Sequence, residues 1–198
     1  MSSSTSSAID PERQRRGRIK ALGIFLVCLA PFVAAYVTYY FWTPDSRMNY
    51  GELLPVRALP EVLGTKADGT ALAAADVRGK WVLVQADSGA CAEPCLKKLY
   101  QMRQVRLAQG KNLDRVERVW LVLDDVAPSA PEPRLVEGVF VVRPQGVAIA
   151  AFPAEGDIRD HVYLIDPMGN IMMRFPKDAD PRRMLKDLQR LLKVSQVG

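Results

Sequence analysis

The sequence predicts an α/β domain that is carried by one N-terminal membrane-spanning helix. An uncharged apolar run covers residues 21–42. Farther along, short β-branched runs alternate with segments whose apolar residues recur every three or four positions, which is typical of α/β domains. The chain ends in a strongly amphipathic segment. About 150 residues follow the apolar run, enough for one domain with its own core.

The apolar run from Ala21 to Trp42 is long enough to cross a bilayer. A helix of 22 residues, rising about 1.5 Å per residue, spans the hydrocarbon core of about 30 Å. Pro31 is compatible with it, because membrane helices tolerate proline. The alternative is a cleaved signal peptide, whose apolar region is usually about 7–15 residues and is followed by small residues. This run is longer and ends in bulky aromatic residues, which favours an anchor.

Charges on either side of the run predict its orientation. Only Asp45 and Arg47 follow closely, whereas five basic residues precede it, and cytoplasmic flanks carry the excess of Lys and Arg. These five residues are Arg13, Arg15, Arg16, Arg18 and Lys20. We expect a basic cytoplasmic tail (1–20), a transmembrane helix (21–42), a linker (43–57) and an extracytoplasmic domain (58–198).

The net charge of +5 does not predict a nucleic-acid partner. The first 20 residues carry five of the 27 basic side chains and two of the 22 acidic ones, so the remainder is near neutral. Nucleic-acid binding needs basic residues clustered on one face. The basic tail is sufficiently explained as a topology signal.

The predicted elements of the domain follow one another in a strand, helix, strand order. Strands are expected over 80–86, 119–123 and 139–142, a helix over 96–109, a proline-rich loop over 126–134, and a hairpin of residues 162–165 and 171–175. In the last helix, Asp180 can cap the N-terminus and Pro181 suits the first position. Its apolar side chains share one face and should pack on the sheet: Met184, Leu185, Leu188, Leu191 and Leu192.

Two cysteines lie between the first predicted strand and the helix that follows, in the sequence Cys91-Ala92-Glu93-Pro94-Cys95. The N–H groups at a helix start favour thiolate, which is both the nucleophile and the metal ligand. A pair spaced like this can exchange electrons as a disulfide or hold a soft ion such as Cu(I). A static disulfide is the alternative. It is disfavoured, since a bridge that closes so small a loop constrains the unfolded chain little.

Other residues with possible chemistry give weaker signals. His161, the only histidine, stands just before a predicted strand, where an ordinary polar role is the more frequent one. Cys28 lies in the apolar run and is expected to behave as a small hydrophobe. Asp124 and Asp125 follow a predicted strand, where an aspartate can belong either to a functional site or to a turn. Three methionines could assist copper, although packing explains them better: Met168, Met172 and Met173.

The order of elements and several short motifs resemble known proteins. The overall order resembles the thioredoxin fold, and DG (68–69), GKWVLV (79–84) and YLIDPMGNI (163–171) resemble its membrane-tethered extracytoplasmic branch. The Cys-x3-Cys spacing, one histidine near YLIxP and the acid after LVLDD (121–125) are similar to the Sco/SenC family. NYGELLP (49–55) and CLKKLYQMRQVRLAQGK (95–111) resemble a small Sco-like group of bacterial membrane proteins associated with cytochrome c oxidase.

This resemblance implies a role for particular residues. Cys91 and Cys95 match the family's cysteine pair, His161 approximates its histidine and Asp124 matches its strand-ending acid. The family handles copper in the assembly of cytochrome c oxidase, delivering it to the copper site of subunit II or reducing that site's thiols. The chain differs from the family in lacking a proline after each cysteine and in the position of His161, which stands a few residues later.

Three functions are therefore open. In the first, Cys91, Cys95 and His161 bind Cu(I) for delivery to oxidase subunit II or its maturation factors. In the second, the protein is a periplasmic thiol-disulfide oxidoreductase in which Cys91 attacks and Cys95 resolves. In the third, a thioredoxin-like scaffold docks on the oxidase without catalysis. Each places the chain in the bacterial inner membrane as a single-pass protein, in contact with the lipid bilayer, with its N-terminus cytoplasmic and its domain periplasmic.

Overall fold

The computed structural model describes residues 11–41 and 49–195 of the chain. It separates into two units, residues 1–47 and 48–198, which are described here one at a time. Parts of the expected tail (1–10) and linker (43–48), together with Trp42 and residues 196–198, lie outside the described residues.

The N-terminal unit is one helix, α1 (Pro11–Phe41), which continues through Pro31. Its segment Arg15–Tyr40 is long and apolar enough to cross a membrane, and none of it is buried in the described structure. Large apolar side chains such as Phe25 and Phe32 are exposed along it. A soluble core helix would bury such side chains, so this helix has the character of a membrane span.

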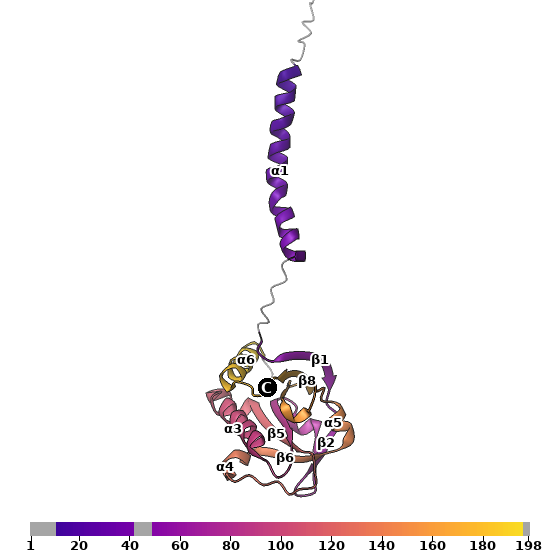
Figure 1. The fold of residues 1–198 in the computed structure, drawn as a ribbon, viewed down its shortest axis with the longest axis vertical. Helices are drawn as coiled ribbons and strands as arrows, with labels where there is room; N and C mark the ends of the chain where they lie inside the picture. Colours follow the sequence, from indigo (N-terminus) through magenta and orange to yellow (C-terminus); the bar gives the residue numbers. More distant parts are fainter. Residues whose placement is uncertain (1–10, 42–48, 196–198) are drawn as a thin grey trace, which may run out of the picture. The chain divides into compact units, whose positions relative to one another are not determined.

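The second unit is built on an eight-stranded mixed sheet with the order β1-β8-β7-β4-β5-β6-β2-β3 (Figure 1). β4, β5 and β6 are parallel to one another, and the remaining pairs are antiparallel. The strands are β1 (Glu52–Ala58), β2 (Val62–Lys66), β3 (Ala71–Ala73), β4 (Trp81–Asp87), β5 (Val116–Val122), β6 (Val139–Pro144), β7 (Val162–Ile165) and β8 (Asn170–Phe175). The helices are α2 (Ala74–Val77), α3 (Glu93–Leu107), α4 (Pro133–Val136), α5 (Gly146–Ala150) and α6 (Pro181–Val194), with 3-10 turns η1 (Gly110–Arg115) and η2 (Ile158–Asp160).

Alternation along the central strand divides the core between the two faces of the sheet. Trp81 and Leu83 of β4 belong to the cluster that includes side chains of α3 and α6. Val82 and Val84 point the other way and pack in a cluster with Phe152 and residues of β2, β3 and α2. Because successive side chains of a strand face opposite sides, a residue's place in the register decides which cluster it joins.

The expected fold class is confirmed, and the element boundaries show where the sequence signal was weak. The hairpin of β7 and β8 is antiparallel as expected, and α6 begins at Pro181 with Asp180 as its cap, whose carboxylate accepts the N–H of Arg182. The helix expected over 96–109 begins earlier, at Glu93. The strands β1, β2 and β3 were not expected. β1 and β2 contain Pro55 and Gly64 and pair with the distant strands β8 and β6, and β3 has only three residues.

Candidate functional site at the cysteine pair

Cys91 and Cys95 are joined by a disulfide bond, with an S–S distance of 1.96 Å and a Cα–Cα distance of 5.0 Å. Cys95 lies in the first turn of α3, whose cap is Ala92, and Cys91 lies in the loop that follows β4. Both are buried, with exposed fractions of 3% and 1%. Cys28, in α1, is free. The sulfur pair therefore stands at a helix N-terminus, where thiolate is favoured once the bond is reduced.

The backbone at Cys91 is in the left-handed region, with φ of 42°. A residue with a Cβ atom is disfavoured there by roughly 1 kcal/mol or more. The N–H of Cys91 donates to the carbonyl of Ser88 at 3.1 Å, which closes a tight turn before the disulfide. Contacts elsewhere must hold this turn in place.

The proline-rich loop after β5 supplies those contacts. Asp124 accepts the N–H of Gly89 at 2.9 Å, and the carbonyl of Gly89 accepts the N–H of Ser129 at 2.9 Å. A Cβ atom added at Gly89 would lie 2.1 Å from the carbonyl oxygen of Val126, so only glycine fits this close approach. The loop that carries Cys91 is thus tied to the loop after β5 on both sides of Gly89.

Asp124 is the acid of this arrangement. The hydroxyl of Ser88 and the N–H of Gly89 donate to its carboxylate, and they hold the pKa of Asp124 below its ordinary value of 3.8. Asp125, in contrast, is exposed, and its backbone carbonyl accepts a hydrogen bond from Arg143. Of the two acids singled out by the sequence, Asp124 positions the cysteine loop and Asp125 faces solvent.

Gln85 is a buried polar residue next to the disulfide that the sequence analysis missed. Its side chain is fully buried, and its Nε2 donates to the Sγ of Cys95 at 3.6 Å. Its Oε1 has no hydrogen-bond partner among the described residues. The available signal was a polar residue inside an otherwise apolar central strand, because such a residue has to find a partner in the core.

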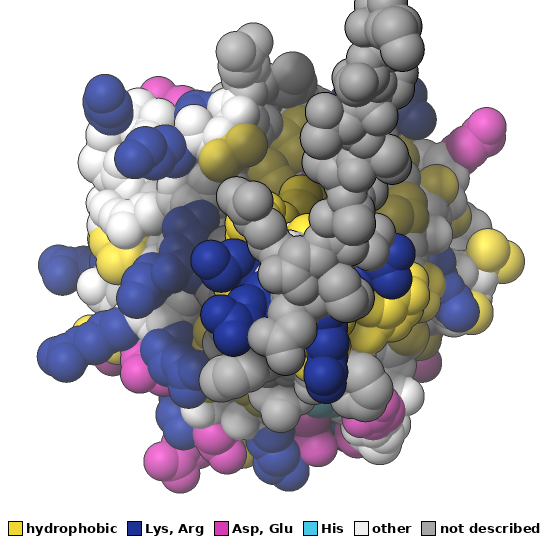
Figure 2. Space-filling view, turned by 90° about the horizontal axis from the view of Figure 1, so that it is seen from above, with side chains coloured by type: hydrophobic (Ala, Val, Ile, Leu, Met, Phe, Trp, Pro, Cys, Tyr) yellow, Lys and Arg dark blue, Asp and Glu magenta, His cyan; other side chains and the backbone are white. Residues whose placement is uncertain are grey.

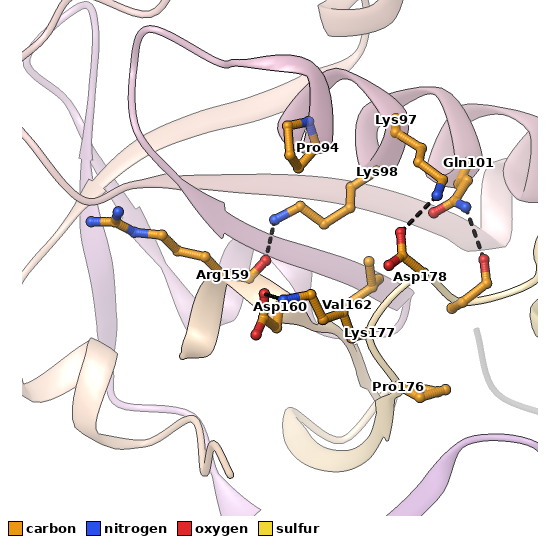
Figure 3. Close-up of a pocket in the computed structure, with 11 residues that line it drawn as sticks. Pro94, Lys97, Lys98, Gln101, Arg159, Asp160, Val162, Pro176, Lys177 and Asp178 are labelled. Carbon is orange, nitrogen blue, oxygen red and sulfur yellow. Dashed lines mark hydrogen bonds and ion pairs between the residues drawn. The ribbon is translucent and has the colours of Figure 1, made fainter. Parts of the chain in front are cut away.

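Lys98 connects α3 to the loop that precedes β7. It is 8% exposed, and its Nζ donates to Asp87 at 2.7 Å, to the carbonyl of Ala86 at 3.2 Å and to the carbonyl of Arg159. The last of these bonds appears in Figure 3. A small cavity of about 120 Å³ lies at this junction, lined by Pro94, Lys98 and Asp160, among others.

The charged side chains at this cavity are largely paired with one another. Lys97 pairs with Asp178 at 2.7 Å, and Lys177 pairs with Asp160 at 3.0 Å. Figure 3 shows the guanidinium of Arg159 extending away from the other labelled side chains. The helix that begins beside the disulfide and the loop before β7 therefore form a shared, charge-balanced surface.

His161 follows η2 and faces away from this junction. In the antiparallel register Gln85 pairs with Val162, and Val84 pairs with Tyr163, so Val162 lies on the α3 side of the sheet. By alternation His161 belongs with Tyr163 on the opposite side, and the two rings are edge-to-face with centroids 6.1 Å apart. The imidazole is 8% exposed.

Both ring nitrogens of His161 lie near backbone carbonyls. Nδ1 is 3.0 Å from the carbonyl oxygen of Phe175, and Nε2 is 3.5 Å from that of Glu155. A carbonyl only accepts, so the shorter contact requires a proton on Nδ1 and leaves the lone pair of a neutral imidazole on Nε2. This tautomer is the one found in metal-ligating histidines whose other nitrogen donates to a carbonyl.

The structure brings together only part of the residues singled out by the sequence. Cys91 and Cys95 meet, and Asp124 supports their loop. In the described part of the chain, no three His, Cys, Asp or Glu side chains are grouped to hold one metal ion. Among the methionines, Met173 is buried in the core, whereas Met168 is exposed in the turn between β7 and β8. The three-ligand set with His161 stays a prediction.

A thioredoxin-like domain with a cysteine pair at the start of a helix, together with an apolar N-terminal helix, defines a class of membrane-attached thioredoxin-fold proteins. The model of the transmembrane-like, thioredoxin-like C-terminal domain matches residues 81–195, and that of the transmembrane-like N-terminal domain matches residues 11–41. The chain belongs to this family. No curated protein matches it.

Solved structures of Sco proteins share the fold. Copper-bound yeast Sco1 matches with a TM-score of 0.57 and 13% identity, covering 72% of this chain and 96% of its own. Apo Sco1 of Thermus thermophilus matches with a TM-score of 0.55 and 15% identity, covering 75% and 99%. A thiol:disulfide interchange protein from a Bacteroides species matches with a TM-score of 0.52 and 17% identity, covering 73% and 93%. The chain is thus similar in fold to copper-binding Sco proteins and to thiol:disulfide interchange proteins.

Proposed function

We propose that this chain is a membrane-anchored, Sco-like thiol protein of the bacterial inner membrane. Its reduced cysteine pair takes up Cu(I) as cargo for the copper site of cytochrome c oxidase subunit II. The observation that carries the proposal is the meeting of two buried sulfurs, those of Cys91 and Cys95, at the N-terminus of α3. The copper reported in yeast Sco1, which shares the fold, supports the choice of ion.

The chemistry of the pair suits this ion once the disulfide is reduced. Two thiolates are soft ligands that select Cu(I), and the α3 N–H groups favour their charge. His161 would supply the third contact through Nε2, with Nδ1–H still bonded to the carbonyl of Phe175. Because His161 faces the other side of the sheet from Gln85, the loop before β7 must shift for this contact to form.

The location follows from α1 and its flanking charges. The basic residues before the span support a cytoplasmic N-terminus and a periplasmic thioredoxin-like domain. In that compartment the resting form of the pair is a disulfide, and copper uptake requires an electron donor of the dithiol class.

A competition titration with Cu(I) tests the proposal. Reduced full-length chain in detergent micelles is expected to bind one Cu(I), and Cys91→Ser or Cys95→Ser should abolish tight binding. Cys28→Ser is the matched control, since Cys28 is free and lies in α1, and it should bind as the wild type does. His161→Ala should weaken binding less than either cysteine change. A wild-type chain that does not bind Cu(I), or a His161→Ala chain with unchanged affinity, would contradict the metal site or its third ligand.

A thiol-disulfide oxidoreductase is the second candidate, and the S–S bond itself favours it. In this reaction the Cys91 thiolate attacks a partner disulfide and forms a mixed disulfide, releasing one partner thiolate. The Cys95 thiolate then attacks the Cys91 sulfur and releases the second partner thiolate, so the partner is reduced and the domain oxidised. An external dithiol restores the reduced pair.

Trapping separates this candidate from copper delivery. A Cys95→Ser chain cannot resolve the mixed disulfide, so a redox partner should accumulate as a covalent adduct on Cys91. If membranes yield no adduct and the chain binds Cu(I) tightly, the oxidoreductase candidate is excluded and copper handling is the remaining one. A Cys91→Ser, Cys95→Ser double variant that still supports oxidase assembly would favour a scaffold over both.

A further inference from the structure

The exposed face of α6 is basic along its whole length. Six polar side chains of α6 are exposed, of which Gln189 is neutral and the other five are basic. The basic ones are Arg182, Arg183, Lys186, Arg190 and Lys193. The single acidic residue of the helix, Asp187, is 2% exposed and faces inward. Figure 2 views the end of the domain where α6 and β1 lie, and Lys and Arg side chains gather over much of this face, with most acidic side chains toward its lower edge.

The chain enters the domain on this same helix. The N–H groups of Tyr50 and Gly51 donate to the carboxylate of Asp187 at 2.7 and 2.9 Å. The Tyr50 hydroxyl accepts the N–H of Asp180 at 3.0 Å, and the guanidinium of Arg183 lies 3.9 Å from the centroid of the Tyr50 ring. Residues at the start of the described part of the domain are therefore hydrogen-bonded to α6.

Covalent connectivity limits how far α6 can be from the bilayer. Residues 42–49 join Phe41, the last residue of α1, to Tyr50. Even a fully extended segment of this length reaches only about 30 Å. A tether this short holds the basic face at a high effective concentration near the membrane surface, whatever the segment's conformation.

We propose that the basic face of α6 binds the anionic headgroups of the bilayer that holds α1. The positive charge of the face suits an anionic surface, and the short tether favours a lipid surface over an acidic protein. Each Lys or Arg near an anionic surface strengthens binding by about fivefold, and the attraction falls off within a Debye length. The proposal rests on α1 spanning the bilayer and is independent of the chemistry of the cysteine pair.

Lysine labelling of the full-length chain in lipid nanodiscs tests this proposal. Lys186 and Lys193 report on the α6 face, and Lys66, in β2 near the other edge of the sheet, is the internal reference. An amine-acetylating reagent is applied in discs of phosphatidylcholine alone and in discs that also contain phosphatidylglycerol. We expect Lys186 and Lys193 to react at least about fivefold more slowly in the anionic discs, with Lys66 unchanged. High salt should remove the difference.

Two matched variants separate the α6 face from overall charge. Arg182→Glu with Gln189→Glu places two acids on the face, keeps both lysine reporters, and should abolish the difference between the discs. Arg134→Glu with Gln145→Glu makes the same change in net charge on α4 and before α5, and should preserve it. Both pairs are exposed in the folded domain.

Each contrary outcome overturns the proposal in a recognisable way. Equal labelling in the two kinds of disc, with the chain still embedded, means that the face does not bind anionic lipid. Slow labelling in both discs that persists in high salt indicates an apolar contact. Protection seen only in native membranes indicates an acidic protein partner. A chain that does not remain with the discs would show that α1 is not a membrane anchor, and co-elution of chain and discs measures this separately.

Discussion

Replacing Gln85 with leucine should change the redox equilibrium of the disulfide. The amide N–H of Gln85 is the polar group that donates to Cys95 from the sheet, at 3.6 Å from its Sγ. In the oxidised domain this contact is weak, because a disulfide sulfur is a poor acceptor. After reduction, Cys95 can carry negative charge, and the same N–H then stabilises the reduced state.

The size of the effect follows from the strength of that hydrogen bond. Hydrogen bonds to charged groups contribute about 1.5–3 kcal/mol, and a sulfur acceptor falls at or below the lower part of this range, about 1–2 kcal/mol. For a two-electron couple, 1.4 kcal/mol corresponds to about 30 mV. Gln85→Leu should therefore make the reduction potential more negative by about 20–40 mV.

The same substitution has a separate effect on stability. The Oε1 of Gln85 is buried without a partner among the described residues, and such a group costs about 1–3 kcal/mol. Leucine removes this cost in both redox states, so it cancels in the potential. We expect the oxidised Gln85→Leu domain to be as stable as the wild type or more stable.

Equilibration with glutathione buffers, followed by thiol trapping and mass spectrometry, measures the potential. Gln101→Leu is the matched control. Gln101 is another buried glutamine, of α3, but it donates to the carbonyl of Ala179 at 2.8 Å and not to a sulfur. It should lower stability and leave the potential unchanged. A potential for Gln85→Leu within about 5 mV of the wild type, or an equal shift in Gln101→Leu, would refute the reasoning, because 5 mV is far below the expected effect.

Three further predictions concern the contacts around the site and the tether. Gly89→Ala forces a Cβ against the carbonyl of Val126 at 2.1 Å and should cost about 1–3 kcal/mol in thermal unfolding, whereas Gly146→Ala, in open space, should cost nothing. Asp187→Ala removes the acceptor of the part-buried N–H of Tyr50 and the buried N–H of Gly51, and should cost about 3–5 kcal/mol in denaturant unfolding, with Asp187→Asn between it and the wild type. The lowered pKa of Asp124 means that its support of the cysteine loop is complete above pH 3.8 and is lost as the pH falls through its lower folded value. A phosphine should therefore reduce the disulfide of the Asp124→Ala variant faster than that of the wild type at pH 7. The ratio of the two reduction rates should approach one in acid, and a ratio that does not change with pH would contradict this.

Much of the fold was predictable because its signals are local. The β7–β8 hairpin follows from a turn of residues 166–170, and the apolar stripe of α6 from its helical spacing. The strands β1 and β2 were not predictable, since Pro55 and Gly64 interrupt their patterns and only pairing with β8 and β6 makes them strands. The expected linker extended over most of β1 for this reason.

In the candidate site, the chain order and residue types determined the cysteine pair. Five residues carry both cysteines between a strand and a helix, so their sulfurs are close in any fold that keeps this order. The partners of the pair were a different matter. Gln85 reaches Cys95 because of its face on β4, and Asp124 reaches Gly89 because β5 lies parallel to β4 with its end at the same edge.

The sequence by itself determined the apolar span, the expected orientation of the chain, the α/β class and the cysteine pair that forms the disulfide. These depend on composition and short spacings, which survive any arrangement of the elements. Only the tertiary structure decided which side of the sheet His161 faces, because a shift of one residue in the β4–β7 register would reverse it. It also decided that the domain begins on α6, where the inward Asp187 binds Tyr50 and Gly51 while the basic side chains remain outside. Contacts between residues more than 130 positions apart are set by packing and not by local sequence.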